Sequence, residues 1–321
     1  MEPKGKKPLV VAIAGPTATG KTEAAVAVCE ALDGEVLSMD SMQIYRRMSI
    51  GTAKPAAAET RGIPHHLLSY VEPGTDYTVA EYQRDARAAM LDVLGRGKLP
   101  VFVGGTGLYL QAVSHPLTFG AAGGRSEARV RLEAAADEPG GPRRLFERLA
   151  AVDPSSAERL HVNNTRRVIR ALEVYELTGT PLSAQQADWE AEPEQDFLVF
   201  ALSWPRDALY RRINSRVDRM MEAGLVDEVR GLLESGVPPE SQAMQAIGYK
   251  EVVALLCGGC TREDAVEAIK RNSRRYAKRQ LTWLRRDSRV RWVNLESYVS
   301  IDAMHSDLVK WIRGYGQGGF V

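Results

Sequence analysis

The chain has 321 residues, of which 44% are hydrophobic and 26% charged, which is enough for one large α/β domain and a smaller one. Its formal net charge of +1 excludes a global attraction to nucleic acid, so any such binding must come from local clusters of charge. No run resembles a signal peptide or approaches a membrane span, so we expect a cytoplasmic protein that does not bind a membrane.

A glycine-rich motif follows the first predicted strand. Residues 9–14 predict a buried parallel strand, residues 15–22 match G-x-x-x-x-G-K-[ST], and residues 23–32 predict a helix. In this order they form a phosphate-binding loop, whose backbone N–H groups and helix N-terminus point at an anion. We predict that the whole motif binds the phosphate, namely Gly15, Pro16, Thr17, Ala18, Thr19, Gly20, Lys21 and Thr22. Lys21 adds a mobile charge and the Thr22 hydroxyl can hold Mg²⁺, but the motif leaves the bound compound open.

The second predicted strand ends in a carboxylate. Gly34 is predicted to end the first helix, and residues 35–40 predict a strand with Asp40 at its C-terminal end. Because α/β sheets bind ligands at this edge, Asp40 is a candidate to accept a proton from an acceptor substrate. The alternative is an aspartate that caps a turn or lies in the Mg²⁺ shell. The residues through Tyr45 combine hydrogen-bonding groups with an aromatic ring, which suits a planar base.

The next segments add a helix, a strand and a second glycine-rich turn. A capping box opens a predicted helix over residues 78–94, and residues 99–103 predict a buried strand. Two glycines and Thr106 follow that strand, which allows a ligand close to the backbone and offers one hydroxyl. The histidines at 65–66 and the C-x-x-C pair at 257–260 lack the partners that a metal site requires.

Together with later blocks, these motifs resemble the tRNA dimethylallyltransferases, also called tRNA isopentenyltransferases. The resemblance rests on blocks in one order, at residues 15–22, 40–45, 50–55, 64–68, 104–109, 166–173, 245–250 and 277–285. It implies an α/β fold, with a P-loop NTPase-like parallel sheet, flanking helices and a helical insertion domain. No zinc-finger tail follows the blocks, so we expect the bacterial form.

Residues 125–193 are charged and alanine-rich, and we interpret them as a helical insertion between two parts of the core, residues 1–124 and 194–321. Three arginines of the insertion share one side of a predicted helix: Arg166, Arg167 and Arg170. Such a trio is by itself most often a solvated face. The resemblance instead implies a contact with RNA, to which Arg129 contributes.

After the insertion, residues 197–202 predict a further buried strand of the same sheet. The helix after it carries several arginines, of which the resemblance assigns Arg216 to a diphosphate. Residues 290–295 predict an edge strand, residues 301–313 a closing amphipathic helix, and residues 314–321 a loose tail.

A long basic helix is predicted over residues 261–287. Between residues 270 and 286 it carries eight basic residues and no acidic one, and residues 270–279 place their charges on one half of the helical wheel. Like charges this dense repel one another unless a polyanion neutralises them. The pattern therefore favours nucleic-acid binding over a merely solvated helix.

The resemblance implies transfer of a dimethylallyl group from dimethylallyl diphosphate to the N6 amine of adenosine 37 in tRNA, beside the anticodon. Asp40 would be the base, while Lys21, Thr22-held Mg²⁺ and Arg216 would stabilise the departing diphosphate. Thr106 would hydrogen-bond near the scissile oxygen or the amine, and the sequence leaves open which. We expect a monomer whose partners are dimethylallyl diphosphate and the tRNA anticodon stem-loop.

The implied tRNA contacts come from several parts of the chain. They are Asp40, Ser41, Met42, Gln43, Thr106, Arg129, Arg166, Arg167, Arg170, Gln245, Ala246, Ile247, Gly248, Tyr249, Lys250, Lys278, Arg279 and Arg285. A flipped adenine would lie against residues 40–43 and 245–250, because chemistry on a stacked base is sterically blocked.

Three alternatives remain at this point. A small-molecule or nucleoside kinase also pairs a phosphate loop with an acid after the second strand, but it leaves the basic helix unexplained. Prenylation of a free adenine nucleotide needs neither that helix nor the arginines of the insertion. An RNA-binding protein with a relict loop is disfavoured because Lys21, Thr22 and Asp40 are all present.

Overall fold

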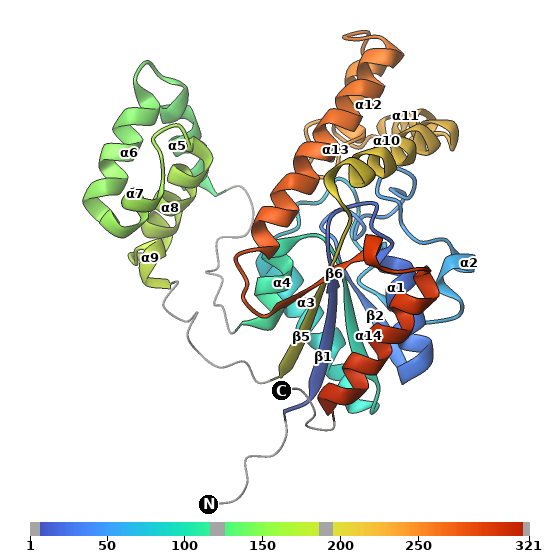
Figure 1. Cartoon of the computed structure of the whole chain (residues 1–321). Helices are drawn as coiled ribbons and strands as arrows, with labels where there is room; N and C mark the ends of the chain where they lie inside the picture. Colours follow the sequence, from blue (N-terminus) through green and yellow to red (C-terminus); the bar gives the residue numbers. More distant parts are fainter. Residues whose placement is uncertain (1–6, 116–125, 186–194, 317–321) are drawn as a thin grey trace, which may run out of the picture. The chain divides into compact units, whose positions relative to one another are not determined.

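The fold is built on a parallel sheet of six strands in the order β3-β2-β4-β1-β5-β6 (Figure 1). The computed structural model describes residues 7–115, 126–185 and 195–316. The strands are β1 (Leu9–Ala14), β2 (Gly34–Met39), β3 (His65–His66), β4 (Leu99–Gly104), β5 (Asp196–Ser203) and β6 (Val290–Asn294). The predicted parallel α/β sheet is thereby confirmed.

Helices connect and cover these strands. They are α1 (Lys21–Leu32), α2 (Ala57–Thr60), α3 (Val79–Gly95), α4 (Gly107–Ser114), α10 (Arg206–Glu222), α11 (Leu225–Glu234), α12 (Tyr249–Leu256), α13 (Arg262–Leu284), the 3₁₀ turn η2 (Leu295–Ser297) and α14 (Ile301–Gly316). Helices α1 and α14 contact each other, and their apolar side chains form one core with those of β1, β4 and β5. This cover explains why the central strands are continuous apolar runs.

Several element boundaries differ from the predictions. Gly34 does not end the first helix: Asp33 takes the left-handed conformation there (φ 49°), and Gly34 already belongs to β2. The predicted tail is partly wrong, since residues 314–316 continue α14, while residues 317–321 lie outside the described residues. The capping box is confirmed, because Glu81 accepts hydrogen bonds from the backbone N–H and hydroxyl of Thr78.

The sheet register brings the functional loops to one edge. Ala14 at the end of β1 and Met39 at the end of β2 both pair with Gly104 at the end of β4. The phosphate loop, the Asp40 segment and the second glycine turn therefore leave the sheet at the same level. This is the edge at which α/β sheets bind ligands.

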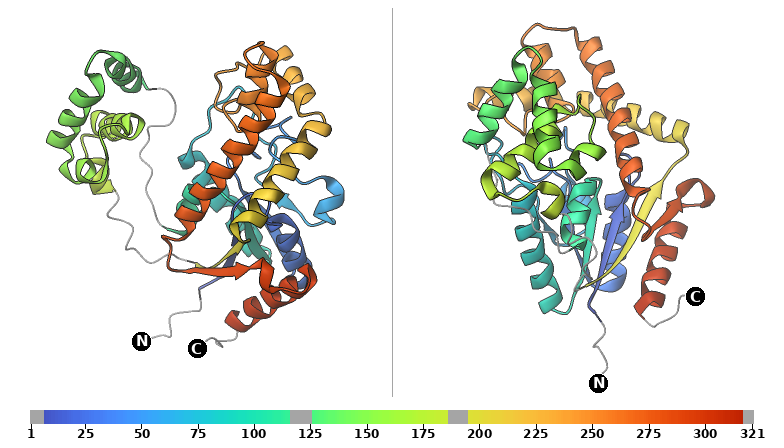
Figure 2. Two further views of the ribbon diagram at one scale, coloured as in Figure 1. Left: turned by 45° about the horizontal axis from the view of Figure 1, so that its top comes forward. Right: turned by 90° about the vertical axis from the view of Figure 1, so that its left-hand side faces the viewer.

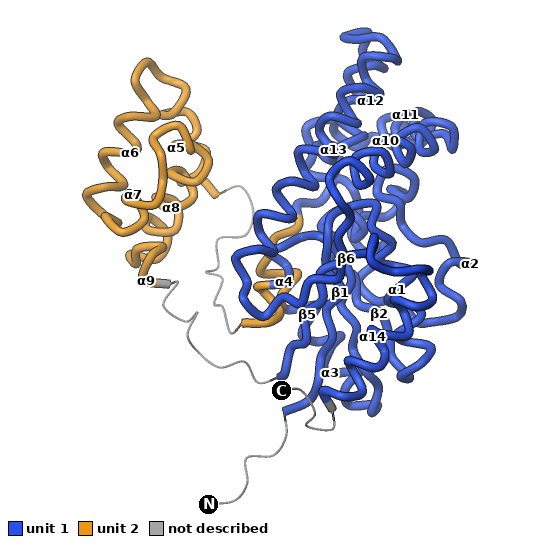
Figure 3. The backbone as a smooth tube through the Cα atoms, in the orientation of Figure 1, with its two compact units in different colours: residues 1–76, 84–110, 194–321 blue, residues 77–83, 111–193 orange. Residues whose placement is uncertain are grey.

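The chain divides into two compact units (Figure 3). Unit 1 comprises residues 1–76, 84–110 and 194–321, and unit 2 comprises residues 77–83 and 111–193. The described part of unit 2 is helical, with α5 (Glu127–Asp137), α6 (Gly141–Val152), α7 (Pro154–Arg159), α8 (Thr165–Thr178) and α9 (Leu182–Gln185). Its own apolar core includes Leu132, Leu149 and Leu172. The predicted insertion boundaries near residues 125 and 193 lie outside the described residues.

In unit 1, α10 and α13 lie next to each other in the left view of Figure 2 and contact each other. Leu209 and Ile213 of α10 pack against Ala277 of α13. The helical region that was predicted to be basic is thus fixed to the arginine-bearing helix after β5. None of the described helices combines the length and the apolar character that a membrane span needs.

Candidate functional site

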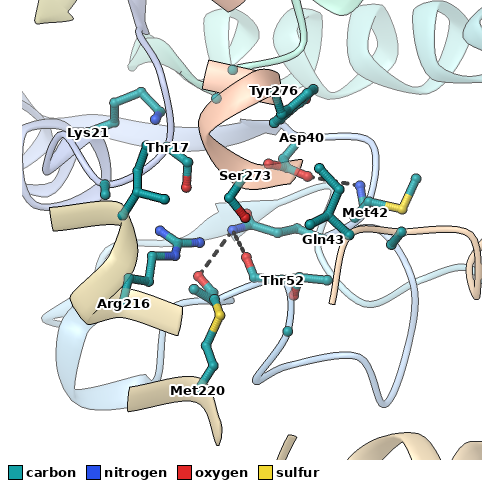
Figure 4. A pocket seen from close by; sticks show the side chains of 18 of the residues that line it. Thr17, Lys21, Asp40, Met42, Gln43, Thr52, Arg216, Met220, Ser273 and Tyr276 are labelled. Carbon is teal, nitrogen blue, oxygen red and sulfur yellow. Dashed lines mark hydrogen bonds between the residues drawn. The ribbon is translucent and has the colours of Figure 1, made fainter. Parts of the chain in front are cut away.

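A cavity of about 660 Å³ opens at the carboxyl edge of the sheet (Figure 4). Its walls come from the phosphate loop, the segment after β2, the loop at residues 51–55, α10, the turn before α12, and α13. Both charged groups predicted for the donor side, Lys21 and Arg216, line it together with Asp40. Segments distant in the sequence thus converge on one volume that can hold a small molecule.

The phosphate loop has the conformation that its glycines permit. Gly15 has φ 143°, and a Cβ there would lie 2.6 Å from the carbonyl oxygen of Leu202, so no other residue fits. Predicted phosphate ligands from Thr17 to Thr22 line the cavity, whereas Gly15 and Pro16 do not. The Pro16 carbonyl instead accepts hydrogen bonds from the Thr19 hydroxyl at 2.9 Å and the Lys21 ammonium at 2.6 Å. These first two residues shape the loop.

The donor side of the cavity holds more positive than negative charge. Burial and the neighbouring Arg216 lower the pKa of Lys21 to about 7, although Asp40 acts in the opposite direction. Burial also lowers the pKa of Arg216, again against the effect of Asp40. Both shifts indicate that the nearby negative charge does not fully neutralise these two cations. An anion such as a diphosphate would supply the missing negative charge.

Asp40 and Thr106 occupy neighbouring turns with different exposure to the cavity. The Asp40 carboxylate lines it and accepts a hydrogen bond from the Met42 N–H at 2.9 Å. Thr106 is not part of the lining, and its hydroxyl oxygen accepts from the Ser41 N–H at 3.2 Å. Asp40 therefore faces a ligand directly, while Thr106 supports the backbone next to it.

Gln43 lines the cavity, but its amide is engaged within the protein. Its nitrogen donates to the carbonyls of Thr52 and Ala53 at 3.3 and 3.2 Å, and its oxygen accepts from the Ser38 hydroxyl at 3.2 Å. Figure 4 shows this side chain between the Asp40 segment and the Thr52 loop. The amide fixes the wall against which a planar ligand would lie.

The predicted base-holding block at residues 245–250 divides into two groups. Gln245, Ala246, Ile247 and Lys250 line the cavity, but Gly248 and Tyr249 do not. Tyr249 is fully buried, and its hydroxyl donates to Glu228 at 2.6 Å. Direct contact of Tyr249 with a base is thus the wrong expectation, because the ring belongs to the core.

Glu228 on α11 is a support that the sequence analysis missed. Its carboxylate accepts hydrogen bonds from the backbone N–H groups of Ser49 and Ile50 at 2.8 Å and of Gly51 at 3.2 Å. It thereby fixes the loop that carries Thr52 and Ala53, the partners of Gln43. Nothing local in the sequence marks a carboxylate that binds a loop so distant along the chain.

The basic face of α13 is smaller than predicted. Lys270 is an ion-pair partner of Asp218 at 2.7 Å, and Arg274 donates to the Asn214 side chain at 2.7 Å. Both contacts go to α10, so these two residues hold the helices together. Lys278, Arg279 and Arg285 are exposed, as a surface for RNA requires.

In unit 2, two of the predicted RNA contacts serve the fold. Glu173 is fully buried and accepts charge-assisted hydrogen bonds from Arg129 at 2.8 Å and Arg170 at 2.9 Å. These bonds and one from the Ser126 hydroxyl outweigh the effect of burial and hold the pKa of Glu173 at about 2. Arg166 and Arg167 are exposed on the same helix.

Three further residues of the site were not singled out by sequence. Gln280 and Tyr276 of α13 line the cavity, and Arg212 of α10 donates to the Ala18 carbonyl of the phosphate loop at 2.9 Å. Gln280 lies within residues 277–285, one of the blocks that carry the family resemblance, and this was the only sequence signal that could have identified it. No signal in the sequence marked Tyr276 as a cavity residue.

Metal binding by protein ligands alone finds no support in the described residues. They contain no cluster of three or more histidine, cysteine, aspartate or glutamate side chains suited to a metal ion. Thr22, however, lines the cavity. Its hydroxyl fits a Mg²⁺ ion that takes its remaining ligands from substrate phosphates and water.

The chain is similar to known transferases over most of its length. A family model described as IPP transferase matches residues 43–287, and one described as isopentenyl transferase matches residues 8–70. The tRNA dimethylallyltransferase of Pelotomaculum thermopropionicum is 48% identical over 314 residues, with 98% of this chain and 99% of the relative covered. That of Desulforudis audaxviator is 50% identical over 289 residues, with 90% and 93% covered.

Solved structures give the same result. The tRNA isopentenylpyrophosphate transferase of Bacillus halodurans matches with a TM-score of 0.71 and 44% identity, with 96% of each chain covered. A eukaryotic dimethylallyltransferase, described in crystallographic snapshots as acting on tRNA, matches with a TM-score of 0.83 and 28% identity. That match covers 98% of this chain and 81% of the other.

Proposed function

Because the chain belongs to the IPP transferase family, whose matched relatives are tRNA dimethylallyltransferases, we propose that it prenylates tRNA. The donor is dimethylallyl diphosphate, and the acceptor is the N6 amine of adenosine 37, next to the anticodon. One observation carries this proposal: a phosphate loop with surplus positive charge and a carboxylate that faces the same cavity. The first suits a diphosphate leaving group, and the second suits an amine that must lose a proton.

The donor half of the reaction needs charge stabilisation. As the allylic C–O bond breaks, negative charge develops on the diphosphate, close to Lys21, Arg216 and the N–H groups of the phosphate loop. Thr22 would hold Mg²⁺ together with diphosphate oxygens, and that ion would add positive charge to the leaving group. Mg²⁺ is part of the proposal because Thr22 lines the cavity that would hold the diphosphate.

The acceptor half needs a base. The N6 nitrogen forms a bond to the allylic carbon while the C–O bond to diphosphate breaks, and one proton leaves N6. The Asp40 carboxylate accepts that proton in our proposal, because it is the carboxylate at the end of β2 and lines the cavity. The reaction yields N6-dimethylallyladenosine, diphosphate and a protonated carboxyl group.

The adenosine reaches the cavity only when it leaves its stack in the anticodon loop. We propose that the exposed Lys278, Arg279 and Arg285 of α13 bind the phosphates of the anticodon stem-loop. Arg166 and Arg167 are exposed on unit 2 and are proposed as further phosphate contacts. We further propose a monomer that acts in the cytoplasm, where its tRNA substrate is found.

A labelled donor tests this function. The protein is incubated with dimethylallyl diphosphate labelled in the allyl group and either an anticodon stem-loop or AMP, with and without Mg²⁺. We expect the label in the stem-loop, with one diphosphate released per transfer, no label in AMP, and little transfer without Mg²⁺. A stem-loop with guanosine at position 37 is the matched control and should stay unlabelled. Label in AMP alone, or transfer of the γ-phosphoryl group of ATP with the RNA unmodified, would overturn the proposal.

A further inference from the structure

The buried side chain of Gln280 joins the phosphate loop to the end of β4. It is 6% exposed, and its amide oxygen accepts a hydrogen bond from the Thr17 N–H at 3.1 Å. Its amide nitrogen donates to the Gly105 carbonyl at 3.0 Å. A Cβ at Gly105 would lie 1.9 Å from that nitrogen, so the glycine makes room for the bridge. One side chain of α13 thereby ties together two walls of the cavity.

Tyr276, one helical turn earlier, lies beside the bridge. Burial raises the pKa of Tyr276 to about 12, and the neighbouring side chains of Thr106 and Gln280 act in the opposite direction. Thr106 in turn accepts from the N–H of Ser41, the residue after Asp40. Hydrogen bonds of Gln280 and Thr106 therefore connect the phosphate loop, through α13 and the turn at residues 105–106, to the segment of the proposed base.

The same helix presents its basic side chains at this point. The Arg279 guanidinium lies 5.5 Å from the centre of the Tyr276 ring, and Arg279 lines the cavity while remaining exposed. Lys278 and Arg279 directly precede Gln280 in the sequence. An RNA phosphate that binds Arg279 would therefore bind a side chain that contacts Tyr276. The next residue in the sequence, Gln280, is hydrogen-bonded to the phosphate loop, so only a short path separates the RNA from the donor loop.

We propose that Gln280 and Tyr276 are positioning residues that couple RNA binding on α13 to the donor loop. When RNA occupies the basic side chains, the bridge holds the Thr17 turn and the Asp40 segment in the arrangement that binds the diphosphate. Each substrate then raises the affinity for the other by the same factor, since such coupling is reciprocal. This inference rests on the proposed function and assigns to it two residues that do not themselves take part in bond formation.

The test measures donor affinity with and without RNA. An anticodon stem-loop with purine riboside at position 37 lacks the N6 amine, so it binds without reacting. In the unaltered protein we expect this RNA to tighten binding of dimethylallyl diphosphate by about tenfold, within the usual range of allosteric coupling. Gln280→Met keeps the shape of the side chain but removes both hydrogen bonds. In this variant we expect RNA to tighten donor binding by less than twofold. The affinity of the variant for RNA in the absence of the donor should change by less than threefold.

Two variants separate coupling from mere stability. Tyr276→Phe keeps the ring and removes only the hydroxyl, so it should also reduce the coupling, even if Gln280→Met does not fold. Gln83 does not line the cavity, and Gln83→Met removes a buried amide that donates to the Ala112 carbonyl at 2.7 Å. This variant should lower the melting temperature while leaving the coupling intact.

Full coupling in Gln280→Met or Tyr276→Phe, or equal donor affinity with and without RNA in the unaltered protein, would overturn the inference. Failure of the unaltered protein to prenylate the adenosine stem-loop would instead overturn the proposed function.

Discussion

The cavity and the helical unit 2 both contain arginine side chains, but the positive charge of these side chains is neutralised differently in the two places. In unit 2 the buried carboxylate of Glu173 raises the pKa of Arg129 through a hydrogen bond. In the cavity, burial lowers the pKa of Arg216 and Asp40 compensates only in part. Paired charge serves the fold, whereas a surplus of half-buried positive charge is a sign of a ligand site. A cluster of arginines in a sequence does not distinguish the two.

The largest expected effect comes from removing a cation of the cavity. Arg216→Met should lower kcat/KM for the donor by about 100-fold or more, because a group that stabilises the leaving diphosphate is lost. The melting temperature should stay the same or rise, since repulsion of Lys21 is relieved. Steady-state kinetics and thermal unfolding of the same preparation check both. A marked loss of stability with unchanged kinetics would make Arg216 a structural residue like Arg129.

The opposite change in unit 2 should affect stability. Glu173→Gln removes the buried charge that Arg129 and Arg170 share and should lower the free energy of unfolding by about 2 kcal/mol, roughly 30-fold in the folding equilibrium. The pKa of Glu173 is about 2, below its ordinary value of 4.5. Its contribution is therefore complete above pH 4.5 and is lost as the pH falls toward 2. Equal unfolding curves for Glu173→Gln and the unaltered protein between pH 5 and 7 would contradict this role.

The exposed charges of α13 should control the salt dependence of RNA binding. The double variant Lys278→Ala with Arg279→Ala should flatten the slope of log affinity against log salt by about two units, or roughly 15-fold in affinity over a fourfold change in salt. Lys310→Ala with Arg313→Ala removes the same charge from α14 and is the matched control. An unchanged slope in the first variant, or an equal change in the control, would remove α13 from the interface.

The smallest expected effect is a pH dependence of donor binding. Lys21 has a pKa of about 7, so the ammonium that attracts a diphosphate is lost as the pH rises above 7. Donor affinity of the free protein should then fall by up to tenfold per pH unit. Calorimetric titrations between pH 6.5 and 9 measure it. In Arg216→Met the decline should begin at higher pH, because that arginine depresses the pKa of Lys21; a flat profile would show that Lys21 is charged throughout.

The sequence predicted those parts of the fold and site that depend on local pattern. Apolar runs at β1, β4 and β5 and the loop from Gly15 to Thr22 specify strands and a turn by their own composition. The cavity position of Asp40 followed from its place at the end of a parallel strand.

Contacts between distant segments were beyond such reasoning. Glu173 neutralises Arg129, Glu228 binds the loop at residues 49–51, and Gln280 reaches Thr17 across 263 residues of sequence. Lys270 looked like part of a basic face because Asp218, its partner, lies on another helix. Long-range pairing decides whether a charge is free, and only the folded chain reveals it.

The most direct test of the account is a kinetic comparison of the unaltered protein with Asp40→Asn. The amide keeps the size of the carboxylate and can still accept the Met42 N–H, but it cannot take a proton from N6. We expect kcat for transfer to an anticodon stem-loop to fall by about 100-fold or more. Dissociation constants for donor and RNA should stay within about threefold, because Asp40 acts in the chemical step. A kcat within about tenfold of the unaltered protein would contradict the assignment of Asp40 as the base.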